Sequence, residues 1–130
     1  NVSEIKLTPG EQQRDFIYVD DVVSAYQLLV SKRNDLQTGF VSLDLGSGKQ
    51  VSIKEFVSLV WKLANSSSTL NFGALPYRSD EIMHSCADLG LMTRFGWHTR
   101  VALPEGIQHA LRDMEEREQG NLINATETKE

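Results

Sequence analysis

The chain has 130 residues, of which 40% are hydrophobic and 24% charged, values typical of a soluble globular domain and not of a disordered chain. No apolar run approaches the roughly 20 residues of a membrane-spanning helix and no signal peptide opens the sequence, so we expect no membrane association. The net charge is −5, but residues 113–130 hold six acids against two bases, which leaves a nearly neutral body that offers nucleic acid no basic surface.

A single cysteine, Cys86, excludes an internal disulfide framework. It favours a reducing compartment, which predicts a cytoplasmic protein, and we expect the thiol to be a small core side chain. The first residue is Asn1 and not methionine, which suggests a processed, truncated or fragmentary chain.

The first third of the chain carries strand and helix signals in alternation. Polar and apolar residues alternate over 4–8, which predicts a short strand that ends at a Pro-Gly turn, and a second β-prone run covers 16–19. Asp20 is placed to cap a helix over 21–32, whose apolar residues recur at helical spacing. A third strand is expected over 40–45.

The middle of the chain predicts a capped helix and one more strand. Ser52 and Glu55 match the capping-box pattern Ser-x-x-Glu at the start of a helix over 53–64. After a polar break, residues 69–72 form a short β-prone run.

The last part predicts two helices. Asp88 is expected to cap a short helix that Gly96 ends, and Pro104 stands at a first-turn position of the final helix. From Glu118 onward the sequence is polar, and we expect it to be frayed. Alternating strands and helices favour an α/β class, although the strands are too few and too far apart for an independent doubly wound sheet.

The stretch LDLGSGKQ, residues 43–50, raises the question of a phosphate-binding loop. A P-loop requires glycine where Leu43 stands, and Ser or Thr where Gln50 follows the lysine. A dinucleotide fingerprint requires glycine or alanine where Val51 stands. The stretch therefore predicts a turn from a strand into a helix.

Two arginines on predicted loops are candidates for phosphate binding. Arg14 lies in GEQQRDF and Arg78 in LPYRSDE, and guanidinium groups bind phosphates through two parallel hydrogen bonds. Together they could clamp a diphosphate. The alternative is that each forms an ion pair with a nearby acid, Arg14 with Asp15 and Arg78 with Asp80 or Glu81.

Three segments taken together resemble a known family. They are GEQQRDFIYVDDVVSAYQLLV, LDLGSGKQVSIKEFVSLV and YRSDEIMHSCADLGLMTRFGW. In this order they resemble the C-terminal half of NAD(P)-dependent nucleotide-sugar epimerases and dehydratases, the extended short-chain dehydrogenases. The matching positions are Gly10, Gln12, Arg14, Asp15, Phe16, Val19, Asp21, Gly46, Gly48, Ser52, Arg78, Glu81, Ala87, Asp88, Gly96 and Trp97.

The resemblance implies a fold and a binding site. The fold is α/β: a C-terminal fragment of a Rossmann-type extended short-chain dehydrogenase with its small substrate-binding region. Residues 1–112 would be the nucleotide-sugar-binding part, and 113–130 the end of the last helix and an acidic flexible tail. In the family, the arginines that match Arg14 and Arg78 contact the diphosphate of the nucleotide sugar, and the acid that matches Glu81 lies near the ribose.

Two family motifs are missing from the sequence. The glycine motif of the cofactor site and the Tyr-x-x-x-Lys pair with the acid–base tyrosine are both absent. The resemblance therefore implies that NAD or NADP binds the full-length protein, through an upstream cofactor domain. We expect no cofactor on this chain, no catalytic residue in it and no activity from it alone. A full-length homodimer is also implied.

The expected function is the substrate-binding half of a nucleotide-sugar epimerase, dehydratase or reductase. The run EIMHSCADL is similar to enzymes of the family that make deoxysugars for bacterial surface polysaccharide. Two alternatives remain open. One is a non-catalytic nucleotide-sugar sensor, and the other is a protein-interaction module in which both arginines serve only in ion pairs.

Overall fold

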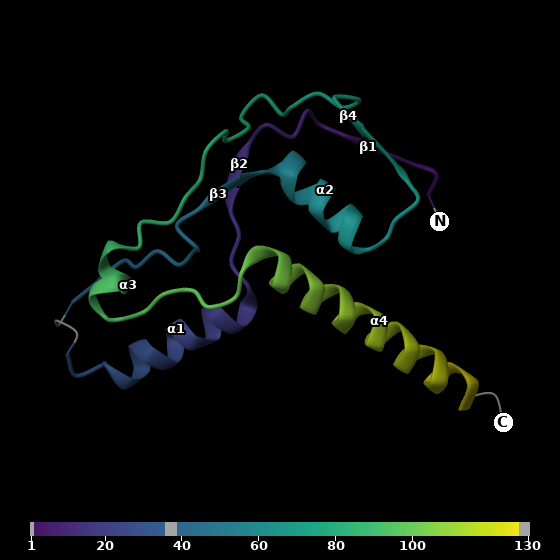
Figure 1. Ribbon diagram of the computed structural model, residues 1–130. Coiled ribbons are helices and arrows are strands. Elements are labelled where there is room, and N and C mark those ends of the chain that lie inside the picture. Colours follow the sequence, from purple (N-terminus) through teal and green to yellow (C-terminus); the bar gives the residue numbers. More distant parts are fainter. Residues whose placement is uncertain (1, 36–38, 128–130) are drawn as a thin grey trace.

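The chain folds into a mixed α/β arrangement of short strands and four helices, shown in Figure 1 as a computed structural model that describes residues 2–35 and 39–127, with side chains through residue 119. In chain order the elements are β1 (Glu4–Leu7), β2 (Gln13–Asp15), α1 (Val19–Ser31), β3 (Gln50–Ser52), α2 (Ile53–Leu63), β4 (Thr69–Phe72), α3 (Gly90–Arg94) and α4 (Leu103–Glu127). The α/β class agrees with the sequence.

Two small sheets join segments that are far apart in the sequence. β1 pairs with β4 in parallel, with Glu4 opposite Thr69, and β2 pairs antiparallel with β3, with Arg14 opposite Val51. The predicted strands at 4–8 and 69–72 are thereby confirmed within one residue.

Two other predicted strands are wrong. The β-prone run 16–19 lies outside β2, which covers Gln13–Asp15 because these residues are the ones that face a partner strand. No strand forms over 40–45, since among the residues described no other strand lies alongside to complete a ladder.

Helix α1 begins before the predicted cap. Its N-cap is Tyr18, with no side-chain cap bond, so the role predicted for Asp20 is wrong. The next acid, Asp21, is buried and accepts hydrogen bonds from the backbone amides of Arg100 and Val101, both at 3.0 Å. Asp21 thereby ties the start of α1 to the loop before α4.

The capping box of α2 is confirmed. The Ser52 hydroxyl accepts from the Glu55 amide at 3.1 Å, and the Glu55 carboxylate accepts from the Ser52 amide at 3.0 Å. Hydrogen bonds from Ser52 to the carboxylate lower the pKa of Glu55 below its ordinary value. The turn before β2 fits against this helix, because Gly10 adopts a φ of +77° and accepts from the Lys54 amide at 2.8 Å.

A small core forms where α1 meets α3. Ala25, Met92 and Trp97 are buried there, and half-buried leucines of α1 pack around them. The indole N–H of Trp97 donates to the Ser24 hydroxyl at 2.9 Å. Helix α3 ends as predicted at Gly96, whose φ is +83°. Asp88 lies two residues before α3 and accepts from the Gly90 amide at 2.9 Å, while Leu89 is the N-cap.

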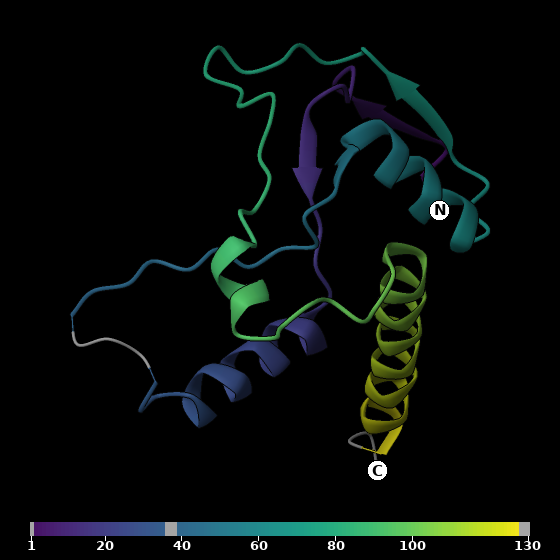
Figure 2. The same ribbon diagram turned by 60° about the vertical axis from the view of Figure 1, so that its left-hand side comes forward.

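Helix α4 begins at Leu103, next to the predicted Pro104, and packs against α2 through its first half. Its second half leaves the rest of the molecule, as both views show (Figures 1 and 2). The helix continues to Glu127, so the fraying expected from Glu118 is wrong. No helix in the described part of the chain is long and apolar enough to span a membrane.

One face of α1 is apolar and exposed. Val19, Val23, Tyr26 and Val30 follow a 4-3-4 spacing, and each is between 48% and 63% exposed. The adjoining segment exposes Phe40 as well. Contiguous exposed apolar patches mark interaction surfaces more often than scattered apolar side chains do.

Candidate functional site

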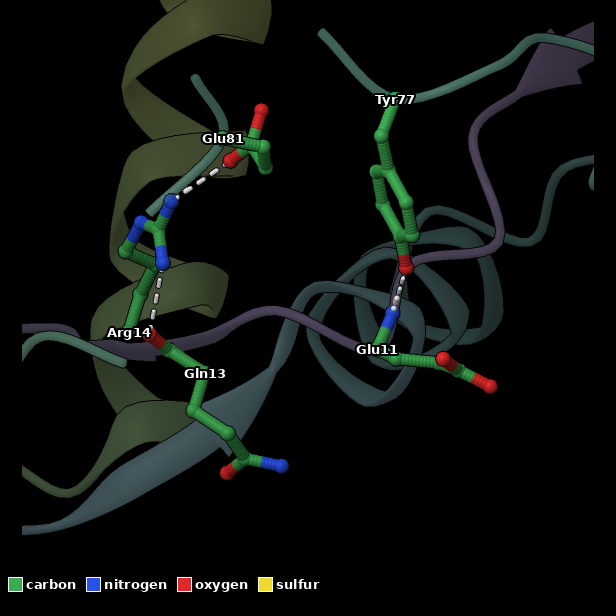
Figure 3. Close-up of polar contacts among 5 residues, drawn as sticks. All are labelled: Glu11, Gln13, Arg14, Tyr77 and Glu81. Atoms are coloured by element: carbon green, nitrogen blue, oxygen red, sulfur yellow. Dashed lines mark hydrogen bonds and ion pairs between the residues drawn. The ribbon is translucent and has the colours of Figure 1, made fainter. Parts of the chain in front are cut away.

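Arg14 forms an ion pair with an acid from a distant segment. Its Nη2 lies 2.7 Å from Oε1 of Glu81, and its Nη1 donates to the Gln13 carbonyl at 2.8 Å (Figure 3). The side chains of Arg14 and Glu81 are 27% and 21% exposed, so the pair is partly shielded from water. Two of the three predicted site residues are thus in direct contact. The alternative partner for Arg14, Asp15, is engaged elsewhere.

The loop that carries Arg78 is anchored on both sides. Before it, the Tyr77 hydroxyl accepts a hydrogen bond from the Glu11 amide at 2.8 Å (Figure 3). After it, Glu81 reaches Arg14, and the Glu81 amide donates to the Arg78 carbonyl at 3.2 Å. The Arg78 side chain is exposed and forms no hydrogen bond or ion pair within the described side chains. Arg78 is therefore presented to solvent on a loop fastened to the Arg14 segment.

Backbone bonds continue this fastening beyond Glu81. The Gln13 amide donates to the Met83 carbonyl at 2.7 Å, and the Ser85 amide donates to the Gln13 carbonyl at 3.2 Å. Gln13 and His84 thus form a parallel bridge beside β2. Since β3 occupies the other edge of β2, the Arg14 backbone is held on both sides.

Asp15 joins three segments behind Arg14. One carboxylate oxygen accepts from the Ser47 amide and hydroxyl at 2.7 and 2.6 Å. The other accepts from the amides of Gly48 and Ala87 at 2.9 and 3.2 Å. Partial burial raises the pKa of Asp15, but these hydrogen bonds together outweigh it, and the pKa lies below its ordinary value.

The same carboxylate affects the cysteine. Cys86 lies 3.8 Å from Oδ2 of Asp15, and desolvation followed by the Asp15 charge raises the pKa of the thiol. Cys86 is exposed, so the prediction of a core side chain is wrong. The residue sits on an irregular segment that leaves its sulfur at the surface, next to a charged group.

The glycine turn does not serve as a phosphate cradle. The amides of Ser47 and Gly48, which would face a phosphate, both donate to Asp15. Gly46 is required because a β-carbon there would collide with the Asp15 carboxylate and with Ala87. The turn therefore binds a carboxylate of its own chain, a contact that the spacing of its residues did not predict.

Tyr77 and Asp15 are the site residues that sequence reasoning missed. The contact of Tyr77 with Glu11 joins residues 66 positions apart, and the contact of Asp15 with Ala87 joins residues 72 positions apart. No local sequence pattern predicts either contact. The sequence offered Asp15 as a motif position and as an ion-pair partner for Arg14, and the pairing with Arg14 is wrong, because Arg14 pairs with Glu81. No group of three or more potential metal ligands occurs in the described part of the chain.

Comparison of the chain with known proteins identifies its family. The model of the family described as "NAD dependent epimerase/dehydratase family" matches residues 2–42. CDP-abequose synthase from Salmonella muenchen is 38% identical over 111 residues, which cover 85% of this chain and 37% of that protein. The chain belongs to the NAD-dependent epimerase/dehydratase family. A second CDP-abequose synthase, from Salmonella typhimurium, is 36% identical over 110 residues, covering 83% of this chain and 36% of that protein.

Solved structures agree with this membership. UDP-glucose 4-epimerase from Thermotoga maritima, determined with UDP-glucose, superposes with a TM-score of 0.73 at 23% identity, covering 88% of this chain and 35% of that one. A UDP-glucose 4-epimerase from Stenotrophomonas maltophila, with bound NAD and a UDP-sugar, gives a TM-score of 0.71 at 26% identity, covering 88% and 36%. The epimerase/dehydratase chain described here thus has the Rossmann-type extended short-chain dehydrogenase fold, and it spans little more than a third of its relatives' length.

Proposed function

We propose that the segment formed by Arg14 and the 77–81 loop binds the diphosphate of a nucleotide sugar, for an NAD(P)-dependent epimerase, dehydratase or reductase. The observation that carries the proposal is the fastening of the Arg78 loop to the Arg14 strand, through Tyr77 on one side and Glu81 on the other. This fastening holds an exposed, permanently charged Arg78 on the segment that packs beside Arg14, and paired guanidinium groups suit a diphosphate.

The cofactor belongs, in this proposal, to another part of the protein. Relatives of known structure carry NAD or NADPH. In this chain the glycine turn does not fit such a group, because its amides are already bound to Asp15. We therefore derive no hydride-transfer step from these residues.

The exposed apolar face of α1 is consistent with contact to a further domain of the full-length protein. This face would pack against the cofactor domain, together with the stretch 40–45 that follows α1 in the sequence. Its residues are Val19, Val23, Tyr26 and Val30. The full-length protein in this proposal is a cytoplasmic homodimer, and residues 1–112 provide the nucleotide-sugar side of its cleft. The similarity to CDP-abequose synthases favours a role in making sugars for bacterial polysaccharide.

Calorimetric titration of the chain with CDP-glucose tests the proposal, with UDP-glucose as a second base. Replacing Arg14 or Arg78 with Gln removes a charged donor, and each change should weaken binding about tenfold or more. Arg112→Gln, at an exposed position of α4, is the matched control and should leave the dissociation constant unchanged.

Three results would contradict the proposal. They are no binding of either nucleotide sugar, equal weakening in the Arg112 variant, or normal binding after both site arginines are replaced. The first result would favour the interaction-module alternative, whereas the last two would leave the Arg14–Glu81 contact as a structural ion pair only.

A further inference from the structure

Glu81 is a fixed negative charge inside the arginine site. Its carboxylate lies 2.7 Å from Nη2 of Arg14. The chain that carries it is bonded to the Arg14 segment at Tyr77, four residues before it, and at Met83, two residues after it. A phosphate that binds Arg14 therefore approaches an acidic side chain held on an anchored segment.

Arg14 keeps enough donors for a ligand while paired. A guanidinium has five N–H groups, and the structure uses one on Nη2 for Glu81 and one on Nη1 for the Gln13 carbonyl. The remaining donors, with those of Arg78, can face a phosphate. The two arginines would then bring two positive charges to the ligand, and Glu81 adds one negative charge beside Arg14.

These charges make the affinity of the site depend on the charge of the ligand. In a nucleotide sugar each phosphate carries one ester and one anhydride link, which leaves it one negative charge, whereas the terminal phosphate of a nucleoside diphosphate carries the anhydride link alone and has up to two charges at neutral pH. The two ligands thus differ by about one negative charge. The Glu81 carboxylate repels this extra charge. A phosphate bound to Arg14 would lie within the roughly 10 Å of Glu81 over which charges interact at about 0.1 M salt.

We propose that Glu81 is a specificity-determining residue, which reduces the affinity of the site for a free nucleoside diphosphate relative to the nucleotide sugar. The inference rests on the proposed function of Arg14 and Arg78. Its consequence is that the carboxylate would help the protein discriminate its substrate from the corresponding nucleotide without contacting the sugar.

The test compares CDP with CDP-glucose on the wild-type chain and on Glu81→Gln, at low salt and neutral pH. Glutamine keeps the size of the side chain and an oxygen that can accept from Arg14. The ratio of the two dissociation constants, CDP over CDP-glucose, should fall about three- to tenfold in the variant. Both ligands contain the same cytidine, so any contact of Glu81 with the ribose cancels in this ratio. The fall should shrink at high salt.

Asp80→Asn is the matched control. Asp80 precedes Glu81, is exposed, and forms no ion pair with the described side chains, yet the change alters the net charge equally. Its ratio should change by less than twofold. An unchanged ratio in Glu81→Gln, or an equal change in Asp80→Asn, would overturn the inference.

The Arg14→Gln and Arg78→Gln titrations separate the two proposals. If they weaken CDP-glucose binding while Glu81→Gln leaves the ratio unchanged, only the role of Glu81 is refuted. If the arginine variants bind normally, the diphosphate site itself is refuted and the inference about Glu81 falls with it. Thermal unfolding of each variant confirms that the fold is retained.

Discussion

The carboxylate of Asp15 accepts two hydrogen bonds from one residue, Ser47, through its amide at 2.7 Å and its hydroxyl at 2.6 Å. The other oxygen of the same carboxylate holds Gly48 and Ala87. A single side chain thus fastens the glycine turn and the segment after the Glu81 loop to strand β2. The shape of the Arg14 site depends on it.

Asp15→Asn should destabilise the chain by about 2 kcal/mol, because hydrogen bonds to a charged group are worth about 1.5–3 kcal/mol each and asparagine can keep only part of the set. Its amide oxygen can still accept from Ser47, but its NH₂ group would face the donor N–H groups of Gly48 and Ala87. Denaturant unfolding measures the loss. Asp44→Asn is the control, since Asp44 accepts from one amide only, that of Asp88.

The same variant has a chemical readout at Cys86. Removing the Asp15 charge lowers the pKa of the thiol towards its ordinary value, so more thiolate forms at a given pH. Alkylation of Cys86 at pH about 8 should therefore be faster in Asp15→Asn than in the wild type. Equal alkylation rates would show that the carboxylate does not control the cysteine.

Stability should depend on acid pH through Asp15. Its pKa is lower in the folded chain than in the unfolded one, so its contribution is complete above about pH 4 and is lost as the pH falls through the folded value. The difference in unfolding free energy between the wild type and Asp15→Asn should narrow below pH about 4. A difference that stays constant from neutral pH to pH about 3 would contradict this assignment.

Tyr77→Phe should affect binding more than stability. The Glu11 amide that bonds to the Tyr77 hydroxyl is exposed, so water can replace the hydroxyl, and the free energy of unfolding should fall by less than about 1 kcal/mol. The Arg78 loop loses one of its two anchors, and the dissociation constant for CDP-glucose should rise about threefold. Tyr26→Phe, on the exposed face of α1, is the control. A binding loss as large as that of Arg78→Gln would indicate direct contact of Tyr77 with the ligand instead.

Sequence reasoning succeeded where the determining contacts are local. The capping box of α2 joins residues three positions apart, and the end of α3 depends on the conformation of Gly96 itself. It failed where distant partners decide. Helix α1 starts without an Asp20 cap, and β2 lies at Gln13–Asp15 because β3 and His84 lie beside those residues.

The candidate site divides in the same way. Arg14 and Arg78 were candidates from their residue type and their place on predicted loops, and the resemblance to a family strengthened this role and added Glu81 to the site. The direct contact between Arg14 and Glu81, and the anchoring of the loop by Tyr77, depend on segments 66 or 67 residues apart. Spacing along the chain carries no information on such contacts.

The core of this chain is small, so single core residues should matter. Met92, a residue of α3, is fully buried in the core with Ala25 and Trp97, and Met92→Ala should cost about 3 kcal/mol of unfolding free energy through lost contacts and a cavity. Its neighbour Leu91 is 41% exposed, and Leu91→Ala should cost less than about 1 kcal/mol. Unfolding curves of the two variants measure the contrast. Equal losses would mean that the packing around Met92 contributes no more than that of a surface residue.

The pairing of β1 with β4 gives the folding reaction a particular order. Glu4 lies opposite Thr69, and the loop closed by this pair contains both Arg14 and the capped helix α2. Helix α2 can form early from its own residues, whereas the arginine site requires closure of a loop of more than sixty residues, which is entropically costly and slow. During synthesis, Arg14 therefore stays without its partner until the Glu81 segment has been made. A nascent chain that ends before that segment would contain Arg14 without Glu81 or the Arg78 loop, and so only part of the proposed site.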